Sequence, residues 1–211
     1  MSEPGALPLP VVDGLRLDQP YRDALRPGAI LRDAAGRGRR LPRFFYEIDS
    51  WETARTMPLS PHFMLWELIY VDVREPELLR TFPRYVPCAV TLMAAALEPF
   101  RAAVGTYVHV AANGGYRSPA HRLSTVATPH CWGTAVNIYR IGDDWLDTQE
   151  TIERYNRIAG ETMGGVRARP WGTGRGFVDD QIHLDLGFVT LVPHSAASEE
   201  EGDGEEVSEP P

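Results

Sequence analysis

The chain has 211 residues, of which 43% are hydrophobic and 24% are charged, and its formal net charge is −8. This composition is typical of a globular protein, and the length suits one domain with a substantial core. Seven acidic residues and no basic ones fall in residues 195–211, and subtracting these seven from the 29 acidic residues leaves 22 against 21 basic ones. A nearly neutral body argues against the extended basic surface of a nucleic-acid-binding protein, so we expect no nucleic-acid partner.

The sequence also indicates a cytoplasmic protein without a membrane partner. No apolar run approaches the ~20 residues that span a bilayer. The first residues, "MSEPGALPLPVVDGLRL", lack a basic region followed by an apolar one, so they do not resemble a secretory signal, although export by another route stays open. Cys88 and Cys131 form no CxxC motif, and we expect two free, buried thiols.

Composition divides the chain into three parts. Residues 1–57 form a Pro/Gly/Arg-rich N-terminal arm with a basic loop, "RDAAGRGRRLPR", followed by a short strand at 43–48. Residues 58–194 have the periodicity of a compact domain. Residues 195–211 form an acidic tail that we expect to be disordered, because it lacks apolar anchors.

Within the domain, hydrophobic spacing and turn signals predict a mixture of helices and strands. Ser60 as N-cap and Pro61 at the first helical position predict a helix over 60–70, and Gly105 predicts the end of a long helix that has Pro87 near its start. The further elements are a short helix at 76–82, strands at 107–113, 134–141 and 181–188, a loop or helical turn at 118–124, and a helix at 147–163 capped by Asp147 or Thr148. This order predicts an α+β fold with a small, mainly antiparallel sheet flanked by helices.

Polar residues on two of these strands indicate a metal site. Alternation places Asn137 on the face opposite Val136 and Ile138, and it places His183 and Asp185 together on one face. Neighbouring strands could therefore bring His130, Asn137 and His183 together. Two imidazoles and one oxygen ligand, with a position left for water, form the donor set of a catalytic zinc site. Asp180, three residues before His183, could take a proton from metal-bound water.

Three segments resemble the motifs of the zinc D-Ala-D-Ala peptidases of the M15 type, which share the hedgehog/DD-peptidase fold. The segments are "GYRSPAHR", "TPHCWGTAVNI" and "DDQIHLDLG", and "LSPHFMLWELI" resembles the segment that precedes the domain in many members. The family pattern is S-G-Y-R-S, then [ST]-x-H-x-x-G-x-A-x-D, then [ED]-x-x-H. The matching positions are Gly115–Ser118, then Thr128, His130, Gly133 and Ala135, then Asp180 and His183. The resemblance covers about residues 58–190, in the family's order.

The resemblance implies a role for each matching residue. His130 and His183 would bind zinc, Asp180 would be the general base, and Arg117 would stabilise the oxyanion. The residues expected to contact substrate are Tyr116, Ser118, Thr128 and Asp185. The implied substrate is a peptide or peptidoglycan fragment, cleaved at a D-amino-acid peptide bond by a metal-activated water. The sequence leaves the oligomeric state open.

Asn137 departs from the family pattern, which has a metal-binding aspartate at this position. A neutral amide oxygen is a weaker zinc ligand than a carboxylate because it does not offset the charge of the metal. Three interpretations follow: zinc binds more weakly with Asn137 as ligand or neighbour, another divalent metal is used, or the site has decayed and holds no metal. In the last case the domain would recognise a peptide or another ligand, through Arg117 and its cleft, without cutting it.

Overall fold

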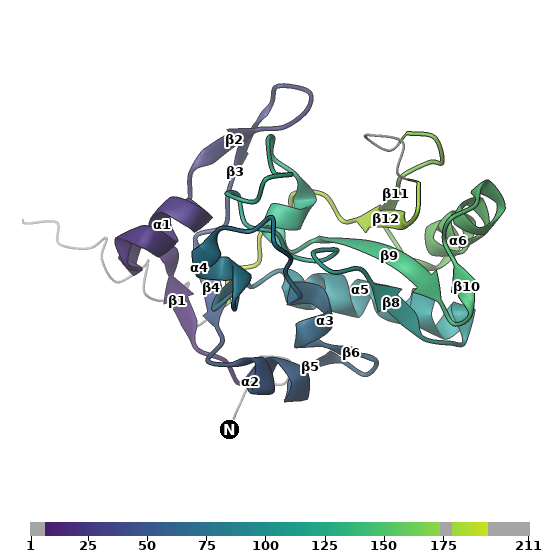
Figure 1. The fold of residues 1–211 in the computed structure, drawn as a ribbon, viewed down its shortest axis with the longest axis horizontal. Coiled ribbons are helices and arrows are strands. Elements are labelled where there is room, and N and C mark those ends of the chain that lie inside the picture. The colour runs from purple at the N-terminus through teal and green to yellow at the C-terminus, as the bar shows by residue number, and fades with distance from the viewer. Residues whose placement is uncertain (1–6, 174–178, 194–211) are drawn as a thin grey trace, which may run out of the picture.

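The computed structural model describes residues 7–173 and 179–193, which fold into an α+β arrangement of short strands and helices (Figure 1). The helical elements are η1 (Gly14–Arg16), α1 (Gln19–Leu25), α2 (Trp51–Thr56), α3 (Leu65–Ile69), α4 (Glu77–Arg80), α5 (Val90–Val104), η2 (Pro129–Trp132) and α6 (Gln149–Thr162). The strands are β1 (Val11–Asp13), β2 (Ile30–Arg32), β3 (Gly38–Arg40), β4 (Phe44–Glu47), β5 (Pro58–Ser60), β6 (Phe63–Met64), β7 (Tyr85–Pro87), β8 (Val108–Val110), β9 (Ala135–Ile141), β10 (Asp144–Trp145), β11 (Arg167–Ala168) and β12 (Ile182–Asp185).

A five-stranded antiparallel sheet carries the polar residues singled out above. The strand order is β10-β9-β12-β11, and β8 pairs with β9 outside this order. The register places His183 opposite Asn137 and Asp185 opposite Ala135. The other sheets of the described residues are also antiparallel, which confirms the predicted α+β class with small antiparallel sheets.

One face of the five-stranded sheet forms part of the hydrophobic core. Val136 and Ile138 of β9 and Ile182 and Leu184 of β12 are each 0% exposed. Helix α5 packs against β9, and α6 packs against α5, β11 and β12, so the two helices lie along this inner face. The alternation predicted from the sequence is therefore confirmed, and it leaves the intervening residues on the opposite, outer face.

Residues 7–57 share this core. Strand β4 lies between β1 and β7 in the second sheet, and Leu25, Phe45 and Ile48 belong to the same buried cluster as the residues of α5 and β9. The boundary placed at residue 57 on composition therefore does not coincide with an edge of the core. The acidic tail, 195–211, lies outside the described residues.

The predicted basic loop forms the β2–β3 hairpin, which extends from the body in Figure 1. Asp33 accepts hydrogen bonds from the Arg37 and Arg39 side chains, so part of the basic charge is balanced within the hairpin. The Arg39 guanidinium lies 4.6 Å from the centre of the Phe188 ring, which in turn packs edge-on against Trp132 at 4.9 Å. These contacts attach the hairpin to the η2 segment that contains His130.

Helix boundaries differ from the prediction at two places. Ser60 belongs to β5 and the helix begins at Leu65, because Ser60 Oγ and the His62 backbone N–H both donate to Glu98 of α5 instead of capping a helix. Pro87 lies in β7, while Gly105 ends α5 in the left-handed region as predicted. Thr148 caps α6, also as predicted. In the described part of the chain, we find no helix with the length and apolar character needed to cross a bilayer.

Gly115 is the tightest of the glycine contacts near the sheet. A Cβ at this position would lie 2.0 Å from the Leu68 carbonyl oxygen, a backbone atom that cannot move alone. We therefore expect Gly115→Ala to lower the free energy of unfolding by roughly 1–3 kcal/mol, as other overpacked substitutions do. A Cβ added at Gly160 in α6 would have no atom within 4 Å. Gly160→Ala should therefore raise the free energy of unfolding by about 0.5–1 kcal/mol. Urea denaturation of both variants tests the contrast, and equal stabilities would contradict the packing described.

Candidate metal centre

A tight turn attaches the Gly-Tyr-Arg-Ser segment to β9. Asn113 adopts a φ of 57°, and a Cβ on Gly114 would lie 2.7 Å from the Asn137 carbonyl oxygen. The Asn137 N–H donates to the Gly114 carbonyl at 2.7 Å, and the Tyr116 N–H donates to the Leu68 carbonyl, also at 2.7 Å. The two glycines thus allow this turn to lie directly against the strand that carries Asn137.

His130 lies at the centre of η2 and is 2% exposed. Its Nδ1 is 2.7 Å from the Gly115 carbonyl oxygen, which can only accept, so the proton is on Nδ1 and Nε2 carries a lone pair. Burial, and then the positive charge of Arg117, hold the pKa of His130 well below its ordinary value. His130 is therefore neutral near pH 7 and has one nitrogen that can act as a ligand.

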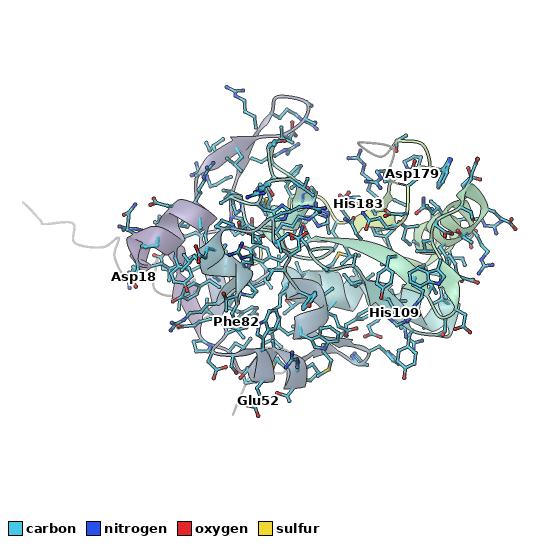
Figure 2. All side chains as sticks on the ribbon, viewed as in Figure 1. Asp18, Glu52, Phe82, His109, Asp179 and His183 are labelled. Atoms are coloured by element: carbon cyan, nitrogen blue, oxygen red, sulfur yellow. The ribbon has the colours of Figure 1, made fainter. Side chains whose placement is uncertain are left out.

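His183 and Asn137 face each other across the β9–β12 pair. His183 Nδ1 lies 2.9 Å from Asn137 Oδ1, and the imidazole rings of His183 and His130 are 5.1 Å apart between centroids. Figure 2 shows His183 on β12, beside β9. The structure thus brings together the three side chains that the sequence grouped, two from adjacent strands and one from η2.

Asp185 fixes the other nitrogen of His183. Its Oδ2 lies 3.0 Å from His183 Nε2, and its Oδ1 accepts from the Gly187 N–H at 2.9 Å. The sequence suggested that Asp185 contacts substrate. In the structure Asp185 is 5% exposed and both carboxylate oxygens have partners inside the protein, so it does not offer a free carboxylate to substrate. A buried carboxylate that accepts from one imidazole nitrogen orients the ring and makes its other nitrogen a stronger ligand.

The 2.9 Å approach of His183 Nδ1 to Asn137 Oδ1 requires a hydrogen atom or a cation between the two side chains. With Nε2–H donating to Asp185, Nδ1 of a neutral imidazole carries a lone pair, and two lone pairs at this distance repel. Three arrangements remove the repulsion: a second proton on His183, an amide turned to present its NH₂ group, or a cation bound by both atoms. Within the described residues, no group of three or more His, Cys, Asp or Glu side chains is placed to hold a metal ion. Asn137 contributes an amide oxygen, which does not belong to this set of ligands.

Arg117 lies beside this cluster and keeps part of its hydrogen-bonding capacity free. Its backbone N–H donates to the His130 carbonyl at 3.2 Å, and its Nε donates to the Asn113 carbonyl at 2.7 Å. Burial lowers the pKa of Arg117 to about 10, so the side chain stays charged at pH 7. Among residues 7–173 and 179–193, Arg117 forms no ion pair, so its terminal nitrogens can receive an anion.

Two acidic residues that the sequence analysis did not single out support the turn. Glu75 is 4% exposed and accepts from the Ser118 N–H at 2.9 Å and the Ser118 hydroxyl at 2.6 Å. The Leu123 N–H donates to His121 Nδ1, so His121 carries its proton on Nε2, which lies 3.3 Å from Asp72 Oδ1. Both acids come from the 70–76 loop, where nothing in the sequence distinguishes them from surface carboxylates.

The remaining predicted residues lie at different depths. Tyr116 is 2% exposed in the core and Ser118 is 0% exposed against Glu75, so neither lines an open cleft, because the tight turn directs both inward. Thr128 is half-buried at the start of η2, and Asp180 is exposed two residues before β12, at the strand's entry as expected.

Searches of protein-family models, of curated proteins and of solved structures found no match for this chain.

We expect the Glu75 carboxylate to be essential to the turn. Glu75→Gln retains one acceptor, but its amide NH₂ would face either the Ser118 N–H or the Ser118 hydroxyl. Leaving one buried donor unpaired should lower the free energy of unfolding by roughly 1–3 kcal/mol. The matched change at exposed Glu77, Glu77→Gln, should stay within about 0.5 kcal/mol of the parent. Similar losses in both variants, measured by urea denaturation, would show that Glu75 does not support the turn.

Proposed function

We propose that this protein is a metal-dependent hydrolase resembling the zinc D-Ala-D-Ala peptidases, with a D-amino-acid or peptidoglycan-type peptide bond as its target. The observation that carries the proposal is the way in which the two histidines are held. Each has one ring nitrogen next to a protein acceptor, a backbone carbonyl for His130 and the Asp185 carboxylate for His183. Metal-binding histidines are oriented in this manner, with the other nitrogen left for the metal. The arrangement also supports assignment of the small antiparallel sheet to a hedgehog/DD-peptidase type of fold.

The donor atoms fit a zinc ion with small adjustment. The ligands would be His130 Nε2, His183 Nδ1 and Asn137 Oδ1. Two ligands at about 2.0–2.1 Å from a tetrahedral zinc lie roughly 3.3 Å apart. The 2.9 Å between His183 Nδ1 and Asn137 Oδ1 would need to open by a few tenths of an ångström. Because all three ligands are neutral, we expect weaker binding than in a site with a carboxylate, with Asp185 supplying negative charge only through His183.

The side chains around the donor atoms suit peptide hydrolysis. A bound divalent metal would supply an acidified water as nucleophile. Asp180, exposed at the entry to β12, is the carboxylate nearest in sequence to His183 on that side, and it would accept the proton of that water. Arg117 would hold the developing oxyanion or the terminal carboxylate of the peptide through its free terminal nitrogens.

A second candidate function is recognition of a peptide terminus without cleavage. The replacement of a charged ligand by Asn137 favours it, because both ring nitrogens of His183 already have protein partners, Asn137 and Asp185, without a metal. The Arg117 guanidinium would remain the principal anion-binding group. The two candidates differ in whether a metal is required, which can be measured directly.

We expect zinc titration of the chelator-treated protein to saturate at about one ion per chain, because a single site of this type is expected. His183→Ala should lose most of this affinity, since it removes one of two imidazole ligands. The matched control is His62→Ala, which removes an exposed histidine that pairs with Glu98. Elemental analysis and calorimetry measure both quantities, and equal uptake by the parent and His183→Ala would refute the assigned ligands.

Asn137→Asp distinguishes the two candidate functions. A carboxylate between two neutral imidazoles should tighten zinc binding, because it offsets the metal charge in a partly dry site. In a decayed peptidase, the variant should release D-alanine from a D-Ala-D-Ala peptide where the parent releases none. In an active enzyme tuned by Asn137, it should bind zinc more tightly but turn over more slowly, since a more electron-rich zinc is a weaker Lewis acid.

Asn137→Ala provides the opposite control for the same measurement. It removes the oxygen ligand without adding charge, so zinc affinity should fall below that of the parent. If neither substitution at residue 137 alters zinc affinity, Asn137 is not a ligand and the proposed site is wrong.

A further inference from the structure

Exposed aromatic rings gather on the outer side of the β8–β9 edge. We call them the aromatic face, which consists of Trp66, Tyr70, Tyr107, His109, Tyr139 and Trp145. Four of its members are unusually exposed for large rings: Tyr107 at 73%, Trp145 at 56%, Tyr70 at 47% and Trp66 at 38%. Aromatic side chains gathered in one exposed patch are typical of ligand-binding and interaction sites.

A β-bulge in the β8–β9 pair lies at the centre of the aromatic face. The register between β8 and β9 shifts between His109 and Val110, so that Tyr139 is the extra residue on β9. The His109 ring lies 6.0 Å from Tyr139, and its Nε2 is 3.1 Å from an Arg140 terminal nitrogen, so consecutive residues of β9 both contact His109. Bulges re-aim side chains in this way and are frequent beside functional sites.

The aromatic face lies on the same sheet as the candidate metal centre. Asn137 and Tyr139 are two residues apart on β9, with Ile138 fully buried between them, so both point to the outer face. Figure 2 shows His109 and His183 on either side of β9, consistent with the strand order. A ligand that lies along β9 could therefore occupy both regions.

Two cavities meet at His109. The first, of about 480 Å³, combines Tyr107 and Tyr155 with Arg140, Asp143 and Asp144. The second, of about 460 Å³, is bounded by Trp66, Tyr70 and Tyr139, with Glu67 at its wall. Each volume is within the range of small-molecule sites, and together they form two adjoining compartments with ring faces and polar groups interleaved.

The charged groups along this face are of both signs and nearly cancel, with Asp143, Asp144 and Glu67 against Arg140 and Arg154. Asp144 pairs with Arg154 and accepts from the Tyr155 hydroxyl, while Arg140 contacts His109 and lies over the Trp145 ring at 5.5 Å. Burial, and then the charge of Arg140, lower the pKa of His109, so it is neutral at pH 7. The face therefore offers ring surfaces and hydrogen-bonding groups and has little net charge with which to attract an ion.

We propose that the aromatic face binds a neutral oligosaccharide. A pyranose ring presents C–H groups on its flat faces and hydroxyls at its edge, which matches rings flanked by Asp143, Arg140 and Glu67. Protein interfaces are also rich in aromatic and arginine side chains. The two cavities of about 480 and 460 Å³, however, have the volume of small-molecule sites and suit single sugar rings. A glycan held along β9 would present an attached peptide to the metal centre. In this respect the oligosaccharide proposal rests on the proposed hydrolase function.

The test is calorimetric titration of the full chain with tetra-N-acetylchitotetraose, a neutral chain of β-linked sugar rings. We expect saturable binding that Trp66→Ala and Tyr107→Ala, one variant for each cavity, weaken about tenfold each by removing a stacking surface. Both side chains are substantially exposed, so the fold should be retained, which circular dichroism checks. Leu15→Ala is the matched control, since it shortens another exposed apolar side chain on the N-terminal part of the chain.

The same variants separate this proposal from the metal assignment. Sugar binding should persist in His183→Ala, and zinc uptake should persist in Trp66→Ala and Tyr107→Ala, because the two sets of residues do not overlap. Absence of saturable sugar binding, or equal weakening by Leu15→Ala, would overturn the oligosaccharide proposal. So would a sugar-free D-Ala-D-Ala peptide whose binding is abolished by the aromatic variants, since the face would then be a peptide site.

Discussion

The pairing of β12 with β9 is the constraint on which the candidate site depends. Its register sets His183 opposite Asn137 while Ile182 and Leu184 close the core. A slip by one residue would place His183 and Asp185 in the core and Ile182 and Leu184 on the outer face, at a cost that no surface interaction could offset. The hydrophobic core therefore fixes the position of the polar cluster. The glycine turn at 114–115 then places Arg117, whose backbone N–H donates to the His130 carbonyl, against this cluster.

Asn137 changes the electrostatics of this cluster more than its geometry. An aspartate at this position would put a negative charge against His183 Nδ1. With the neutral amide, the nearby carboxylates are already engaged: Asp185 by His183, Glu75 by Ser118, and Asp72 by His121. Arg117 is thus left as a half-buried cation without an ion pair among the described residues, so the site attracts anions more strongly and metals less strongly than one with a carboxylate ligand.

The alternation of apolar residues in strands and the spacing of residues in helices correctly predicted the features that depend on local sequence. The inner residues of β9 and β12, the Gly105 and Thr148 helix ends, and the grouping of His130, Asn137 and His183 could all be inferred from the sequence. The helix start expected at Ser60 was wrong because Glu98, 38 residues away in sequence, accepts from the Ser60 hydroxyl and from the His62 N–H, which a helix cap would have bound. The burial of Tyr116 and Ser118 and the role of Glu75 likewise depend on long-range contacts of the 70–76 loop, for which sequence spacing gives no signal.

The bulge at Tyr139 joins the two regions of the outer face through the same strand. An unbroken β9 would alternate, so Tyr139 and Arg140 would point to opposite faces and only one of them could reach His109. The extra residue lets both contact His109, while Ile138 and Ile141 remain in the core on either side. Because the register toward β12 is set by residues 135–138, the bulge reshapes the His109 end of the strand without disturbing the pairing of Asn137 with His183. Substitutions among the aromatic residues at the His109 end of β9 should therefore leave the Asn137–His183 pair in place.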